Sequence, residues 1–357
     1  MKPDLAIDRR TKQRIVAAGI VSLIAWILLQ AISPRTSIPW SEEMREAALR
    51  MERAVNAVAR YTENAGISID ESLDLNRTGL IGPEYSPLFT TLGQLEAKRT
   101  TANPDIAGLM VHLLRRVGVS AGDTIAVGGS ASFPALTIAV VAAAEAMDVH
   151  PVAILSLGSS AYGATRPGFN VLDIHSLLMN EGILSTGPAA VSLGGEDDAG
   201  AGFDPAFREG LLQQILASGV PLVREPDLRE NVARRMGIYG RAVAFVNIGG
   251  SDANLGASPL VLKLEPGLNS EVVQPPIAQR GVLFEMAALG VPVIHLLHIR
   301  GLALRYGLPW DPVPLPKPGT TVLHDDSGAR GGRFWLITAA YFAALGLIVV
   351  IGRSRSG

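Results

Sequence analysis

Four short apolar segments of this chain each end in a polar loop that begins with glycine, and this pattern constrains the fold most. A buried strand followed by a glycine turn and a helix is how α/β folds build ligand sites. Glycine lets the backbone approach a ligand, and free amides at the next helix start attract anions. The segments are Thr124–Val127, Val152–Leu157, Ala190–Leu193 and Ala242–Ile248, with loops beginning Gly128-Gly129-Ser130, Gly158-Ser159-Ser160, Gly194-Gly195-Glu196 and Gly249-Gly250-Ser251.

Helical patterns separate these strands. Residues Ala135–Met147 are apolar almost all round, which predicts a helix buried against the sheet. Further helices are expected after Asp204-Pro205, ending near Gly219, and after Glu225-Pro226, ending near Met236. A helix over about Ile277–Leu289 then precedes a strand at Val293–Leu297. This alternation predicts an α/β fold over residues 105–308, a mostly parallel sheet with flanking helices (Rossmann-like).

The region ahead of this domain, residues 35–104, begins with a helix and continues irregularly. Ser41 is a good cap for a helix running to about Asn64, which serves as a stalk or packs on the domain. The following stretch is broken by glycine and proline, and a loop of that length usually has a function. Asn103-Pro104 then begins a helix that continues to Arg116.

Two uncharged apolar stretches, residues 15–34 and 334–352, are each long enough to cross a bilayer. Basic residues concentrate in segment 1–14, which predicts a cytoplasmic N-terminus, a cytoplasmic tail at 353–357 and an extracytoplasmic domain. The proline-rich part of 309–333 is expected to be an extended tether. A cleaved signal peptide is the alternative for the first span, although Gln30-Ala31-Ile32-Ser33 is a poor cleavage site.

Composition narrows the functional classes. The chain lacks cysteine, which is compatible with an extracytoplasmic location, and its net charge of −2 gives no electrostatic case for nucleic acid. It has neither a phosphate-loop lysine nor an intact G-x-G-x-x-G, so nucleotide binding is unsupported. No cofactor is predicted, although a divalent cation remains an option.

The glycine-led loops carry the candidate ligand-binding residues. Ser130 and Ser132 either form a cradle for a phosphate or carboxylate, or simply close a tight turn and cap a helix. Asp252 and Asn254 follow a strand end, where sites form in open sheets, but an Asx turn explains them too. The full candidate set is Gly128, Gly129, Ser130, Ser132, Ser159, Ser160, Lys98, Arg99, Asp252 and Asn254.

The sequence gives weaker evidence for catalytic or metal-ligating residues than for ligand-binding ones. The elbow G-x-S-x-G fails at Ser130, but a triad of Ser130, His175 and Asp252 could still assemble in space. Glu196, Asp197 and Asp198 form either a cation site or a solvated turn. His295 and His298 have a possible ligand spacing but no visible third ligand, which favours structural roles.

Several phrases in the chain resemble one protein family. They are GLIGPEYSPL from Gly79, TTLG from Thr90, LEAKRT from Leu95, AVGGSASFPAL around Ser130 and SLGSSAYGA around Ser160. Together they resemble the poly-gamma-glutamate system protein family, membrane-anchored bacterial proteins associated with synthesis and export of that polymer. The resemblance extends from the first apolar span to about Leu297. It implies a role in the synthesis and export of poly-gamma-glutamate, but it gives no established catalytic residues to assign in this sequence.

Three functions are open at this point. The resemblance and the lack of a recognised catalytic signature favour a non-catalytic accessory membrane protein whose outer domain binds poly-gamma-glutamate or contacts the synthase and export subunits. Lys98, Arg99 and Arg166 would then meet glutamate-like carboxylates, unless the pair Lys98 and Arg99 is merely exposed. The alternatives are an amide-bond hydrolase or transferase acting on the polymer, and a receptor for a small acidic solute.

Overall fold

The computed structural model describes residues 9–32, 36–225, 227–325 and 332–353. The chain forms two compact units, one made of the residues up to Ile38 and from His324 onward, the other of Pro39–Leu323. The predicted cytoplasmic segments 1–14 and 353–357 lie partly outside the described residues. So do Pro226 and residues 326–331 of the predicted tether.

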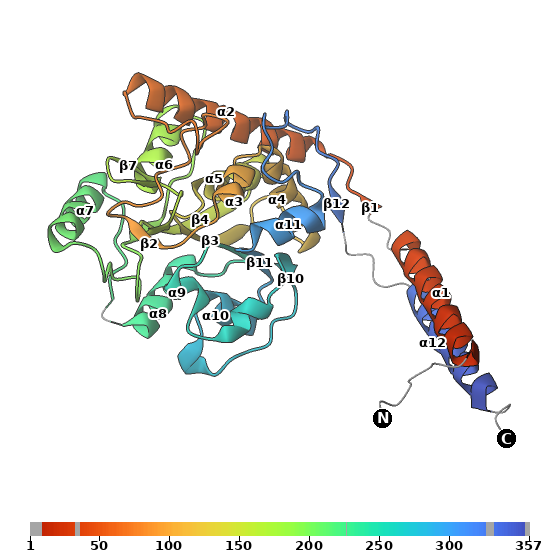
Figure 1. Ribbon diagram of the computed structural model, residues 1–357. Helices are drawn as coiled ribbons and strands as arrows, with labels where there is room; N and C mark the ends of the chain where they lie inside the picture. Colours follow the sequence, from red (N-terminus) through yellow and green to blue (C-terminus); the bar gives the residue numbers. More distant parts are fainter. Residues whose placement is uncertain (1–8, 33–35, 226, 326–331, 354–357) are drawn as a thin grey trace, which may run out of the picture. The chain divides into compact units, whose positions relative to one another are not determined.

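The first unit is a pair of apolar helices (Figure 1). Helices α1 (Arg9–Ile32) and α12 (Gly332–Arg353) lie side by side, and Ser22 Oγ is 3.1 Å from the Tyr341 hydroxyl oxygen. In α1, the stretch Thr11–Leu29 is long and apolar enough to cross a membrane. The apolar stretch of α12 within the described residues is shorter, so the second span stays a prediction.

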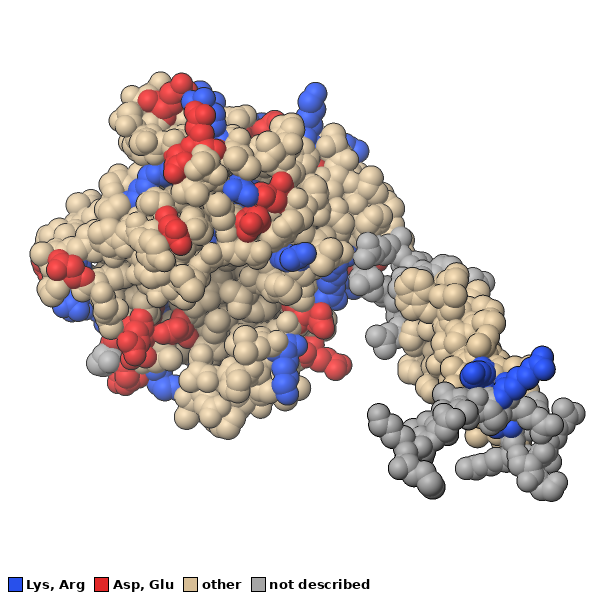
Figure 2. All heavy atoms as spheres, viewed as in Figure 1, with Lys and Arg blue, Asp and Glu red and all other residues tan. Residues whose placement is uncertain are grey.

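Strand β1 (Thr36–Ser37) follows α1 in the sequence, and strand β12 (His324–Asp325) precedes α12. The two short strands pair antiparallel. In the described part of α1, charged side chains occur only near its N-terminal end (Figure 2). Many apolar side chains of both helices, Trp26 and Phe342 among them, are exposed. Such a surface is suited to lipid rather than to water.

A six-stranded sheet is the centre of the second unit, in the order β10-β11-β9-β3-β4-β8. β10 runs antiparallel to β11 at one edge, and the other neighbours are parallel. This confirms the predicted α/β class. The strands are β3 (Thr124–Ser130), β4 (His150–Ser156), β8 (Ala190–Ser192), β9 (Ala244–Ile248), β10 (Gly267–Asn269) and β11 (Val293–Leu296).

One face of the sheet is covered by the apolar helix α5 (Pro134–Ala146), which packs against β3, β4 and β9. Almost every residue of α5 is buried because α2 (Glu42–Asn64) and α4 (Asp105–Arg116) cover its outer side. Ser41 Oγ accepts a hydrogen bond from Met44 N and begins α2 as predicted. α2 is therefore part of the domain rather than a separate stalk.

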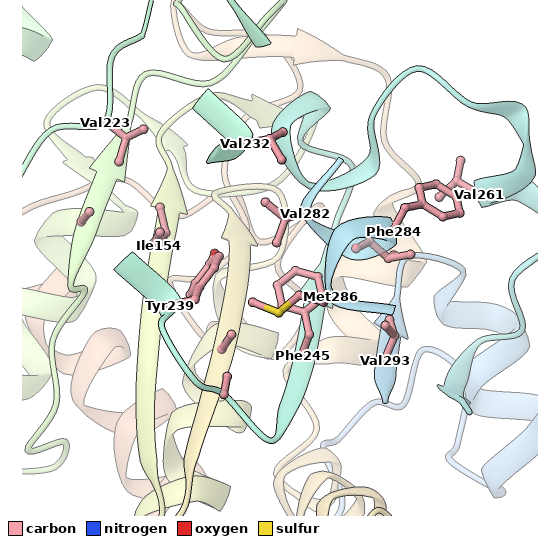
Figure 3. Packing of buried hydrophobic residues seen from close by; sticks show 14 residues of the cluster. Ile154, Val223, Val232, Tyr239, Phe245, Val261, Val282, Phe284, Met286 and Val293 are labelled. Carbon is pink, nitrogen blue, oxygen red and sulfur yellow. The ribbon is translucent and has the colours of Figure 1, made fainter. Parts of the chain in front are cut away.

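The opposite face carries a second core, shown in Figure 3. Tyr239 of α8 (Leu228–Tyr239) and Met286 of α10 (Val282–Ala288) pack toward Phe245 of β9. Tyr239 and Phe245 stack edge to face with ring centroids 5.9 Å apart. Sheet and helices thus form three layers. The remaining helices of this unit are α3 (Leu95–Thr101), α6 (Val171–Asn180), α7 (Pro205–Ser218), α9 (Asp252–Leu255) and α11 (Ile299–Tyr306).

Two expectations about elements are corrected. Gly128 and Gly129 lie inside β3 rather than in the loop after it. A Cβ on Gly128 would lie 2.7 Å from the Asn254 side chain and one on Gly129 2.8 Å from the Leu155 side chain, so both strand positions need glycine. The helix expected over 277–289 is broken into a 3₁₀ turn, Ile277–Gln279, and α10. The break is at Gly281, where a Cβ would lie 2.3 Å from Gly256 N.

The proline-rich segment is fastened to the domain rather than free. Asp311 forms an ion pair with Arg99 at 2.5 Å, and the Asp311 N–H donates to Thr100 Oγ1. Farther along, Gly319 N–H donates to Asp105 Oδ1. The chain is therefore held to the domain well beyond Pro309, and the domain unit extends to Leu323.

Candidate functional site

The segments that follow β3, β4, β8 and β9 meet at one cavity of about 510 Å³ beyond the carboxyl ends of these parallel strands. This edge is where open α/β sheets bind their ligands. Residues 90–98 form a further wall of the cavity; they belong to the stretch predicted to be irregular and include the start of α3. The lining residues fall within 90–98, 130–133, 156–160, 194–196, 250–252 and 297–299.

The irregular stretch reaches the cavity through an added strand pair. β2 (Phe89–Thr91) runs parallel to β5 (Ser159–Ser160), and the Ser159 and Ala161 amides donate to Leu88 O and Thr91 O. The chain then turns at Gly93 and enters α3. A Cβ on Gly93 would lie 2.5 Å from Ala161 O, so only glycine lets α3 approach the second loop this closely.

Lys98 of α3 supplies an amine to this cavity. Its side chain is buried, with the residue 2 % exposed, and its Nζ donates to Ser132 O at 2.5 Å and Ser160 Oγ at 2.7 Å. The amine also lies 3.7 Å from the centre of the Phe133 ring. Burial lowers the pKa of Lys98 to about 7, so the neutral amine is well populated at physiological pH.

Ser160 lies between Lys98 and the first loop. Its N–H donates to Ser132 Oγ at 2.9 Å, which ties the second loop to the first. Both serines line the cavity and are almost fully buried. Ser160 therefore presents a hydroxyl at the cavity wall with an amine of lowered pKa in hydrogen-bond contact.

Ser130 ends β3 and lies between the loops that follow β4 and β9. It lines the cavity, is 4 % exposed, and its hydroxyl has no hydrogen-bond partner in the described part of the chain. A Cβ on Gly249 would lie 2.5 Å from Ser130 Oγ, so the fourth loop presses directly against this hydroxyl. A buried hydroxyl left without a partner is a group that a ligand can satisfy.

The wall formed by the third and fourth loops is acidic. Glu196 and Asp252 line it, and the Asp197 N–H donates to Asp252 Oδ2 at 3.1 Å. Burial raises the pKa of Asp252, and the carboxylates of Asp197, Asp198 and Glu196 raise it further.

Beneath this wall a buried ion pair fixes the third loop. Asp198 and Arg235 of α8 are both fully buried, with 2.6 Å between Arg235 Nη2 and Asp198 Oδ2. Ser156 and Ser192 donate to Asp198 Oδ1, and Asn231 donates to Asp198 Oδ2. Asp198 is thus a structural anchor, and Ser156 connects that anchor to the cavity lining.

The expected triad is not formed. Ser130 and Asp252 line the cavity, but His175 is on α6 outside the lining, and neither of its ring nitrogens has a partner among the described residues. Burial lowers the pKa of His175 to about 4. Its chemistry is therefore that of a neutral core residue.

The other predicted residues have structural partners. Arg99 binds Asp311, Arg166 donates to the carbonyls of Gly79 and Ile81, and Asn254 Oδ1 accepts from Arg235. Ser159 donates to Ser160 O. Lys98 and Arg99 are both buried, so the alternative of an exposed basic pair is wrong.

His295 and His298, the two histidines considered as metal ligands, lie in different surroundings. His298 lines the cavity, whereas His295 contacts Asn247 at 3.1 Å, and burial lowers its pKa to about 4. Within the described ranges, no group of three or more His, Asp or Glu side chains is arranged to hold a metal ion.

The contact between Lys98 and Ser160 could not be found from sequence. The residues are 62 positions apart, and α3 is too short to give a helical pattern. Comparison with family models, curated proteins and solved structures finds no match for this chain.

Proposed function

We propose that the protein is an amide-bond hydrolase or transferase in which Ser160 is the nucleophile and Lys98 the general base. The observation that carries this proposal is the 2.7 Å contact between Lys98 Nζ and Ser160 Oγ at the wall of the cavity. Serine is a weak nucleophile by itself, and a neighbouring base of suitable pKa activates it. A lysine near pKa 7 meets that requirement.

In the first half-reaction, Ser160 Oγ attacks the amide carbonyl carbon while its proton passes to the neutral Lys98 amine. The C–N bond then breaks, and the Lys98 ammonium returns the proton to the leaving nitrogen. The products are a free amine and an ester between the acyl group and Ser160. Burial of the Lys98 amine holds its pKa low.

In the second half-reaction, water or a second amine attacks the ester carbonyl and gives its proton to Lys98. The C–O bond to Ser160 breaks, and the serine recovers its proton. Water yields a carboxylic acid, which is hydrolysis, and an amine yields a new amide, which is transfer. The same two residues therefore serve either outcome.

The family resemblance supplies the substrate of this proposal. Poly-gamma-glutamate is a chain of amide bonds, and the apolar stretch of α1 suits a protein held at the membrane where such a polymer is made or exported. With α12 as a second span, the basic residues ahead of α1 favour an extracytoplasmic domain.

The test uses the full-length chain in detergent with poly-gamma-glutamate and follows polymer length. We expect shortening by the native chain, and loss of at least about 100-fold in rate with Ser160→Ala or Lys98→Met. Ser176→Ala is the matched control, since its hydroxyl bonds Leu172 O within α6, away from the cavity. An unchanged rate in Ser160→Ala would contradict the proposal. So would unchanged polymer length, with or without added amine and divalent cation.

A second candidate is a non-catalytic subunit that holds the polymer. The Ser130 hydroxyl, which has no hydrogen-bond partner among the described residues, favours it, because this group can bind a polar ligand atom without reacting. This function predicts that the purified chain binds poly-gamma-glutamate or synthase subunits equally well with Ser160→Ala. A small-acid receptor instead predicts a rise in Tm with glutamate alone.

A further inference from the structure

The cavity has two chemically different ends. Lys98 and Ser160 form one end, and Glu196 and Asp252 form the other. Lys98 is the only lysine or arginine among the described lining residues, and its hydrogen bonds go to Ser132 and Ser160. The acidic end therefore offers two carboxylates to an ammonium group of a ligand, and none of the described residues that line this end is a lysine or arginine.

Ser130 lies between these two ends. It precedes Ser132 of the Lys98 end by two positions, and its hydroxyl packs against Gly249 of the loop that carries Asp252. This hydroxyl is buried and lacks a partner among the described residues. It is a binding group for a polar atom that lies between a reacting carbonyl at Ser160 and a charged group at the acidic wall.

The acidic end is held in place from below. Asp197 N–H bonds Asp252, and the neighbouring Asp198 is fixed by Arg235. Ser156 joins both loops, with its Oγ 2.9 Å from Asp198 Oδ1 and 3.3 Å from Ser251 Oγ. The third and fourth loops, which carry Glu196 and Asp252, are thus joined to each other and to the Asp198–Arg235 pair.

We infer that the cavity accepts an amide whose acyl unit carries an ammonium group. That ammonium lies between Glu196 and Asp252, and the carbonyl lies at Ser160. This inference rests on the proposed function and specifies its substrate. In a γ-linked glutamate chain only the amino-terminal unit has a free ammonium, so cleavage or transfer takes place at the amino end and interior bonds are excluded.

The test separates binding from chemistry. Full-length Ser160→Ala protein in detergent is titrated calorimetrically with a short γ-linked glutamate oligomer and with the same oligomer acetylated at its amino end. We expect the free oligomer to bind at least about tenfold more tightly. Glu196→Gln and Asp252→Asn are each expected to reduce this preference to about twofold or less, whereas Glu209→Gln, on exposed α7 surface, retains it.

Equal affinity for the two oligomers, tighter binding of the acetylated one, or no binding of either would overturn the inference. Failure of the proposed function looks different. In that case the amine preference persists in binding, but the native chain cleaves neither oligomer. Conversely, cleavage of both oligomers at the same kcat/KM retains the Ser160–Lys98 chemistry and removes the amino-end specificity.

Discussion

Lys98 lies in surroundings that disfavour its charged form, and the proposed chemistry depends on this. Because only the neutral amine accepts a proton, kcat/KM is expected to rise with pH through about 7 and to fall about tenfold per pH unit below it. Lys98→Arg keeps a charge at every accessible pH and should be inactive throughout. A pH–rate profile measures both; a rate independent of pH between about 5 and 8 would contradict Lys98 as base.

The same lysine makes stability depend on pH. Its pKa is lowered from 10.5 to about 7, so between these values the unfolded chain binds a proton that the folded chain does not. Stability therefore rises with pH across this window, and the full cost of burying the charge is present below it. Lys98→Met should lose this rise. Urea unfolding at several pH values tests it, and an equal rise in the variant would contradict the assignment.

The buried pair of Asp198 and Arg235 carries a second prediction. Arg235→Met leaves a carboxylate buried without its cation and is expected to cost about 3–5 kcal/mol of unfolding free energy. Adding Asp198→Asn should recover part of that loss. Arg53→Met removes an exposed ion pair with Glu46 and should change stability by less than about 1 kcal/mol. Denaturant unfolding compares them, and strictly additive losses would argue against a direct pair.

Among the secondary-structure elements, two glycines of similar appearance should behave oppositely. Gly281 breaks the helix pattern because a Cβ would contact the backbone of Gly256, so Gly281→Ala should destabilise by about 1–3 kcal/mol. Gly210 lies within α7 with open space around it, so Gly210→Ala should stabilise by about 1 kcal/mol. Thermal unfolding of the two variants measures both effects. An unchanged Tm in Gly281→Ala would contradict the prediction, because it would mean that the backbone at Gly256 can move away from position 281.

Elements set by local signals could be predicted, and elements set by distant contacts could not. Ser41 begins α2 and Gly219 ends α7 through hydrogen bonds within a few residues, so the sequence shows them. The break at Gly281 depends on a loop that comes earlier in the chain, at Gly256. The same holds for the site: the four loops were visible, but Lys98 reaches Ser160 only through the pairing of β2 with β5.

On the scale of the whole molecule, the absence of cysteine makes the topology directly testable. Single cysteines can be introduced without background labelling. With a two-span arrangement, a cysteine replacing exposed Glu209 should react with a membrane-impermeant maleimide in intact cells. A cysteine replacing Arg9 should react only after permeabilisation. The reverse pattern, or labelling of both in intact cells, would contradict the arrangement.

Neighbouring positions on α3 connect the cavity to the C-terminal part of the domain. Lys98 holds Ser160, while Arg99 holds Asp311 in the segment that continues toward α12. A force that displaces Asp311 would act on Arg99, which is the residue next to Lys98 in α3. Lys98, the proposed acid–base group, is therefore joined through one peptide bond to the residue that holds the segment leading to α12, and loosening the Arg99–Asp311 contact is expected to shift the position of Lys98.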